Sequence, residues 1–158
     1  MSMSDADKAI HDRVAHHIAA TRFPFPDQTD WPEGYQTIVN AGNPQAAVQY
    51  RGHQHGPDIV VIDERQIPRE IGEVEMDIRP EIVPRLTVSS MAAPMIQESG
   101  VRHFFLYVPH ELEEKAREFV ANYRISLAGL RTFEIDDDDV IHIRPVETQG
   151  HAKDHRET

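Results

Sequence analysis

Three carboxylates near the middle of the chain have the types and spacing of a cation site. Asp58 stands at the start of the run DIVVI, and Glu73 and Glu75 alternate along the later segment REIGEVEMDI. Like charges held close together beside an apolar sheet either raise a pKa or recruit a counter-charge, and a set of carboxylate oxygens suits Mg²⁺ or Mn²⁺. The cluster therefore predicts a divalent metal site, where the cation would activate water and neutralise charge on a phosphodiester.

Two neighbouring strands must pair in one register for this site to form. We expect a hairpin in which Ile62 pairs with Arg69, so that Asp58 falls directly opposite Glu73. Directly opposed residues share a face of the sheet, and Glu75, two residues further on, shares it too. A slip of one residue would turn Asp58 to the face opposite both glutamates.

The pattern of the surrounding chain predicts an α/β protein, on the border with α+β. Apolar residues recur with helical spacing in three segments, and β-branched or alternating runs mark the strands. The expected order is a helix, a three-strand meander, a helix, a strand, a further helix and a C-terminal hairpin, with helices covering a mixed sheet. The expected helices are residues 5–20, 80–98 and 110–125. The expected strands are residues 46–51, 58–62, 69–77, 101–109, 130–135 and 140–146, with a short additional strand at 35–39 and a turn at 53–57.

GPDIVVID followed by IGEVEMD resembles the PD-(D/E)XK nuclease superfamily, whose restriction-endonuclease-like core has the order αβββαβ. The resemblance covers roughly residues 5–125. It implies that Asp58 and Glu73 hold Mg²⁺. The third position of the family's motif is normally a lysine that positions or activates the attacking water. Here that position is Glu75, which makes this an E-x-E variant. That glutamate would be an additional ligand or the base.

Other residues enter the site only through this resemblance. Some members place the cation on the following helix, where Arg85 or Arg79 could stabilise the transition state. An acid from the first helix often joins the site, and Asp7 and Asp12 are both candidates. The missing lysine also fits a catalytically inactive nuclease-fold protein that serves as a binding or assembly module. Metal-dependent phosphodiester hydrolysis and this inactive module are the two functions that we expect.

Composition limits the partners of the chain. Its 158 residues carry a formal net charge of −11, with 27 acidic and 16 basic residues, which argues against a broad nucleic-acid-docking face. A nucleic acid that is small or held through a metal remains a candidate substrate, and a homodimer or another protein partner is a further expectation. No apolar run has the ~20 residues of a membrane span, no secretory signal is evident and no cysteine is present, so a cytoplasmic location is expected.

The remaining motifs have simpler explanations. His53 and His55 form an H-x-H pair that could ligate zinc or nickel in a metal hydrolase, but a plain loop is the better interpretation. The acidic run 136–139 lacks the glycine and glutamate spacing of a calcium loop and predicts a solvated hairpin turn. We expect a single domain over residues 1–146, followed by a polar, disordered tail at 147–158.

Overall fold

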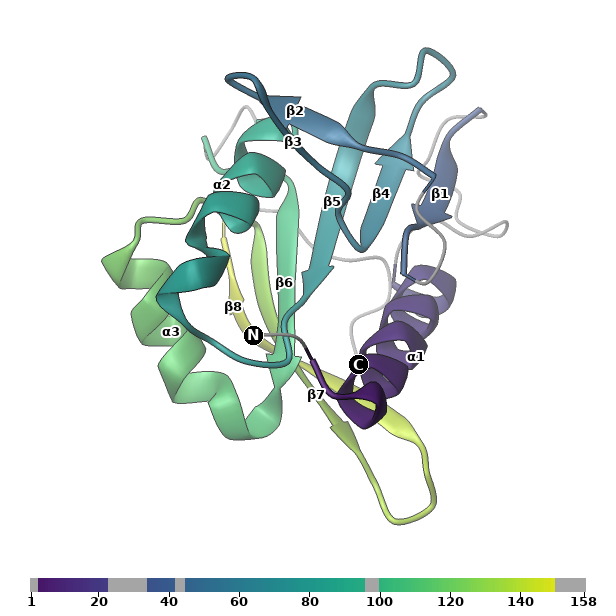
Figure 1. Ribbon diagram of the computed structural model, residues 1–158, viewed down its shortest axis with the longest axis vertical. Helices are drawn as coiled ribbons and strands as arrows, with labels where there is room; N and C mark the ends of the chain where they lie inside the picture. The colour runs from purple at the N-terminus through teal and green to yellow at the C-terminus, as the bar shows by residue number, and fades with distance from the viewer. Residues whose placement is uncertain (1–2, 23–33, 42–44, 96–99, 150–158) are drawn as a thin grey trace.

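The computed structural model describes residues 3–22, 34–41, 45–95 and 100–149. It has three helices packed on a six-stranded mixed sheet of order β1-β4-β5-β6-β7-β8, together with a two-stranded ribbon, β2-β3 (Figure 1). The helices are α1 (Asp5–Thr21), α2 (Val83–Ala92) and α3 (Glu113–Asn122), and the short 3₁₀ turns are η1 (Pro80–Ile82) and η2 (His110–Leu112). The strands are β1 (Gln36–Val39), β2 (Val48–Tyr50), β3 (His53–His55), β4 (Ile59–Ile62), β5 (Pro68–Val74), β6 (Phe104–Pro109), β7 (Gly129–Ile135) and β8 (Ile141–Thr148).

The α/β prediction is confirmed, but the meander is built from a different first strand. β1, β4 and β5 are antiparallel neighbours, and β6 runs parallel to β5. The predicted strand 46–51 does not enter this sheet. Its core, β2, pairs with β3, which lies in the segment predicted to be a turn. A two-residue turn at Arg51 and Gly52, with φ of 49° and 81°, closes the ribbon at once, so β2 finds a local partner.

The register of β4 against β5 is the predicted one where the carboxylates lie. The pairs Ile59–Gly72, Val60–Ile71 and Val61–Glu70 follow the register that sets Asp58 opposite Glu73. The register shifts at the far end of the hairpin, where Ile62 pairs with Pro68 and not with Arg69. Proline cannot donate a ladder hydrogen bond and is tolerated at such bulges, so the irregularity stays away from the carboxylates.

Two apolar layers cover the two faces of the sheet. On one face, Leu86 of α2 and Phe119 of α3 belong to the same buried cluster as Val60 of β4. On the other face, Ile18 of α1 belongs to a second cluster with Val61 of β4. Figure 1 shows α1 on one side of the sheet and α2 and α3 on the other. β4 and β6 are buried on both faces, as their continuous apolar runs predict. No helix in the described ranges is both long and apolar enough to cross a membrane.

The predicted bounds hold for the start of α1 but not for the ends of α2 and β8. α1 begins as predicted, with the Ser4 hydroxyl accepting a hydrogen bond from the amide of Asp7 at 3.1 Å. The helix expected to reach residue 98 ends at Ala92, because Ala93 precedes a proline and is extended; residues 96–99 lie outside the described part of the chain. β8 continues to Thr148, past the expected domain boundary at 146, and residues 150–158 are likewise outside the description.

One buried amide closes the base of the β2-β3 ribbon. The side-chain nitrogen of Asn40 donates to the carbonyl oxygens of Ala46 at 2.8 Å and Pro57 at 2.6 Å, which lie before and after the ribbon. Its side-chain oxygen accepts from the amides of Gln45 at 2.7 Å and Ala46 at 2.9 Å. Asn40 is 6% exposed, so these bonds are made largely out of water. The ribbon is thereby fixed between β1 and β4.

A glycine on β7 makes room for a buried arginine. Arg131 is 1% exposed, and its guanidinium lies 5.5 Å from the centre of the Phe105 ring and donates to the carbonyl of Glu147 at 2.7 Å. A Cβ at Gly129 would lie 2.6 Å from Arg131 Nη1 and 2.7 Å from Phe105 Cδ2. Neither neighbour can move without disturbing the packing of the sheet.

We predict that Gly129→Ala lowers the free energy of unfolding by about 1–3 kcal/mol, as overpacking of a filled interior does. Chemical denaturation monitored by circular dichroism measures the change. Gly56→Ala is the matched control, because the nearest atom to a Cβ there is 3.4 Å away. Equal stability of the two variants would contradict the packing described here.

Candidate functional site

The three carboxylates predicted from the sequence line one cavity. It has a volume of about 600 Å³ and lies where β4 begins and β5 ends, with α1 and α2 contributing residues to its wall. Asp58 directly precedes β4, Glu73 is the next-to-last residue of β5, and Glu75 follows that strand. The side chain of Asp58 is 18% exposed, whereas those of Glu73 and Glu75 are 2% and 6% exposed. Asp58 is thus the most accessible of the three.

Asp58 and Glu73 hold the ends of their strands together by reciprocal bonds. The backbone amide of Asp58 donates to Glu73 Oε1 at 2.8 Å. The backbone amide of Val74 donates to Asp58 Oδ2 at 2.8 Å. One oxygen of each carboxylate therefore accepts a hydrogen bond from the backbone on the opposite side of the hairpin. These bonds continue the β4-β5 pairing beyond its last ladder pair.

The second oxygen of each carboxylate faces a histidine. His11 Nε2, from α1, lies 3.1 Å from Asp58 Oδ1. His55 Nε2, from β3, lies 2.7 Å from Glu73 Oε2, which also accepts from the hydroxyl of Ser89 at 3.1 Å. Three elements outside the β4-β5 hairpin therefore converge on its two acids. Both imidazoles are positioned to carry positive charge.

Burial alone would lower the pKa of His11, but the hydrogen bond and charge of Asp58, reinforced by Asp12, raise it from the ordinary 6.5 to about 9. Asp12 Oδ1 lies 2.8 Å from the other ring nitrogen of His11. Burial opposes protonation of His55 as well, yet the bond to Glu73 raises its pKa. Burial and then the charge of Asp58 raise the pKa of Glu73.

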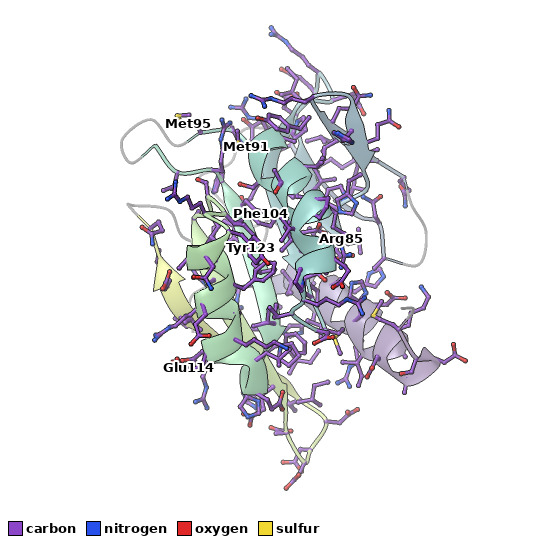
Figure 2. The ribbon with its side chains drawn as sticks, turned by 60° about the vertical axis from the view of Figure 1, so that its left-hand side comes forward. Arg85, Met91, Met95, Phe104, Glu114 and Tyr123 are labelled. Atoms are coloured by element: carbon purple, nitrogen blue, oxygen red, sulfur yellow. The ribbon has the colours of Figure 1, made fainter. Side chains whose placement is uncertain are left out.

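Glu75 is paired with Arg85 of α2. The Nε atom of Arg85 donates to Glu75 Oε2 at 3.2 Å, and its Nη2 atom donates to Oε1. Burial and then the charge of Glu73 raise the pKa of Glu75 to about 7, although Arg85 acts in the opposite direction. Arg85 and Ser89 are four residues apart on α2, so both reach β5 from one face of the helix. Figure 2 shows Arg85 on the side of α2 turned away from α3.

The cavity lining carries more acid than base. Two further acids, Asp7 and Asp77, and a second arginine, Arg79, belong to the wall. The lining thus contains five carboxylates, two guanidinium groups and two imidazoles. If every group is ionised, five negative charges face four positive ones. Of the two helix acids considered from the sequence, Asp7 lines the cavity and Asp12 contacts His11.

The donor set suits a hard divalent cation in chemistry and in charge. Carboxylate oxygens are the ligands that Mg²⁺ and Mn²⁺ prefer. Part of the raised pKa of Glu73 and of Glu75 comes from a neighbouring carboxylate, a repulsion that a cation between the acids would relieve. Within the described residues, no group of three His, Asp or Glu side chains is already arranged around one point as metal ligands. A cation would have to take Asp58 and Glu73 oxygens from their present partners.

Two site residues were missed by the sequence prediction. His55 was interpreted as part of a loop, but it lies on β3 and faces Glu73. His11 was not considered, although it is buried on the same helix face as Val14, Ala15 and Ile18. The usable signal was a polar residue within the apolar stripe of α1. For His55 no such signal exists, because its place depends on where the ribbon folds back.

The other motifs keep simpler structural roles. The acidic run 136–139 is the predicted hairpin turn between β7 and β8. Asp136 Oδ1 accepts from the amides of Asp138 and Val140 at 2.9 Å each. Arg13 Nη1, from α1, lies 2.8 Å from Asp139 Oδ1 and forms an exposed ion pair with it. His53, the partner of His55 in the H-x-H pair, lies outside the lining of the acidic cavity.

We predict that the free energy of unfolding falls as the pH rises from about 6.5 to about 9. His11 holds its proton to about pH 9 in the folded protein, while an unfolded histidine releases it near 6.5. The contribution is therefore complete below pH 6.5 and is lost through pH 9. Its size is about 1–2 kcal/mol once solvent screening is allowed for.

His11→Gln should be less stable than the parent at pH 6 and should flatten this slope, as measured by urea denaturation at several pH values. His16→Gln, at an exposed position of the same helix, is the control and should keep it. An unchanged slope in His11→Gln would show that His11 does not hold its proton against Asp58.

Chemically, the arrangement can attract a cation, hold protons near neutral pH and place a guanidinium beside a buried carboxylate. Its parts come from α1, β3, the β4-β5 hairpin and α2. No protein-family model, curated protein or solved structure matches this chain.

Proposed function

We propose that this chain hydrolyses phosphodiester bonds with Mg²⁺ or Mn²⁺, as a nuclease-like protein of the E-x-E type. The observation that carries the proposal is the convergence of Asp58, Glu73 and Glu75 on one cavity whose lining holds five carboxylates. A phosphodiester would be repelled from this lining unless a cation came with it. When bound, the cation would supply charge neutralisation at the phosphate and activation of water.

The order of elements supports the same proposal. α1 is followed by the antiparallel strands β1, β4 and β5, then by α2 and by β6 parallel to β5. This is the αβββαβ order of the restriction-endonuclease-like core, with the β2-β3 ribbon inserted before β4. α3 and the β7-β8 hairpin extend that core at the far edge. Of the three carboxylates, Asp58 directly precedes β4, Glu73 lies on β5 and Glu75 follows β5.

The contacts favour a separate role for each side chain. Asp58 and Glu73 would be the metal ligands, because they are adjacent and face the cavity. Both oxygens of Glu75 contact Arg85, a cation that a metal would repel, so Glu75 fits the water-orienting base better than a ligand. A pKa of about 7 suits that base. Arg85, held at the wall by Glu75, would stabilise charge that develops on the phosphate.

A second candidate is a binding or assembly module that keeps the fold without catalysis. One observation favours it: each oxygen of Asp58, Glu73 and Glu75 already has a protein donor. The three acids are then balanced by His11, His55 and Arg85 without any metal. A site of this kind would stabilise the junction of α1, β3 and α2 and leave function to the outer surface.

We predict metal-dependent cleavage of single-stranded or plasmid DNA by the purified protein. Asp58→Asn and Glu73→Gln should each lower the cleavage rate by about 100-fold or more, because each removes a charged ligand. Glu114→Gln is the control, since this exposed glutamate lies on α3, away from the cavity (Figure 2). Chelation should abolish the activity, and Mn²⁺ should restore it.

Calorimetric titration with Mg²⁺ and Mn²⁺ separates the two candidates. Binding that is lost in Asp58→Asn supports the nuclease-like function. Absence of binding, together with equal cleavage by the parent and Asp58→Asn, would exclude it and leave the module.

A further inference from the structure

A second cavity adjoins the acidic one and has the opposite charge. It has a volume of about 430 Å³ and lies between the β2-β3 ribbon and α2. His55 and Arg85 line both cavities, so the two meet at the side chains that contact Glu73 and Glu75. The second lining contains Arg51 and His53 in addition and no carboxylate. In a chain with 27 acidic residues, this is a local exception.

We propose that this second cavity binds single-stranded nucleic acid, one or two nucleotides next to the bond that is cleaved. The inference rests on the nuclease-like function, because it assigns the substrate class of that site. The cavity lies at the small end of the range for ligand pockets, about 300–1,000 Å³. The overall negative charge of the chain opposes a long track along a duplex, but a short site with its own positive charge avoids that repulsion.

Arg51 supplies a positive charge that the protein does not use. It is exposed at the tip of the ribbon and forms no ion pair within the described residues. Its guanidinium lies over Tyr50, 5.2 Å from the ring centre, which keeps it at the cavity. Arg85, in contrast, is already paired with Glu75. Arg51 is therefore the cation at this wall that is free to contact a phosphate.

The conformation of Arg51 is unusual for its residue type. Its φ of 49° lies in the left-handed region, where asparagine and glycine are preferred in a two-residue turn of this kind. An arginine here is less favourable for folding than an asparagine would be. A locally unfavourable residue at a cavity points to a role other than stability.

An aromatic ring lies on the same face as these basic groups. Tyr50 pairs with His53 across the ribbon, and Val48 pairs with His55, so all four side chains share a face. Tyr50 is half-buried against the core that contains α2, which fixes its position while its edge lines the cavity. Because the Arg51 guanidinium covers this ring, an unstacked base would stack on the guanidinium plane of the Arg51–Tyr50 pair. The bases of a duplex are not accessible for such stacking.

The test is fluorescence anisotropy with a labelled oligothymidylate of eight nucleotides in EDTA, where no cleavage occurs. The parent should bind it more tightly than a duplex of the same length, and affinity should fall with salt. Arg51→Asn should weaken binding by about fivefold or more while melting at the same or a higher temperature, because asparagine suits the turn. Tyr50→Leu should weaken binding by a similar factor.

Arg144→Asn is the matched control. It removes the same charge from an exposed position on β8, at the opposite edge of the sheet, and should leave affinity within twofold. Unchanged binding in Arg51→Asn, equal loss in Arg144→Asn, or equal affinity for the duplex would each overturn the inference.

Failure of this inference is distinguishable from failure of the proposed function. Binding that depends on Arg51 and persists in Asp58→Asn, without metal-dependent cleavage by the parent, would keep the nucleic-acid site and exclude the nuclease. Cleavage that depends on Asp58, with oligonucleotide binding unchanged in Arg51→Asn and Tyr50→Leu, would keep the nuclease-like function and exclude this nucleic-acid site.

Discussion

The pairing of β4 with β5 is the constraint on which the rest of this structure depends. It sets Asp58 beside Glu73, and each carboxylate then bonds to a backbone amide at the end of the other strand. Asp58 and Glu73 therefore stabilise the strand pairing and also supply the carboxylates of the candidate site. Their negative charge is tolerated under partial burial only because other elements bring cations to it. That requirement places α1, the ribbon and α2 around one point.

The balance of charge at this point explains both candidate functions. His11, His55 and Arg85 satisfy the carboxylates in the absence of metal, so the fold does not need a cation to be stable. Burial and then the charge of Asp58 raise the pKa of Glu73, whereas His55 acts in the opposite direction. Under the proposed function, a divalent cation would have to displace these internal partners of Asp58 and Glu73. Catalysis would then depend on how readily His11 and His55 release the oxygens of Asp58 and Glu73 to the cation.

The sequence predicted those features that depend on local pattern and nearest neighbours. The register that sets Asp58 opposite Glu73 followed from alternation and a short connection, and the structure has it at the carboxylate end. β3 could not be predicted in the same way, because HQH has neither an apolar run nor a strong strand propensity; its pairing depends on the turn at Arg51. The role of His11 depends on α1 docking against the end of the sheet, a long-range contact that a one-dimensional pattern does not carry.

The amide of Asn40 has a consequence for how this architecture can vary. The side chain of Asn40 bonds to the chain that enters the ribbon and to the chain that leaves it. The two ends of the ribbon are therefore held together at its base. Changes at the tip of the ribbon, beyond the contacts of Val48 with the core and of His55 with Glu73, leave the ladder of the central sheet unaltered. Arg51, the residue proposed to select a ligand, lies at that tip and is the part of the site that can vary, whereas His55 is constrained by its bond to Glu73.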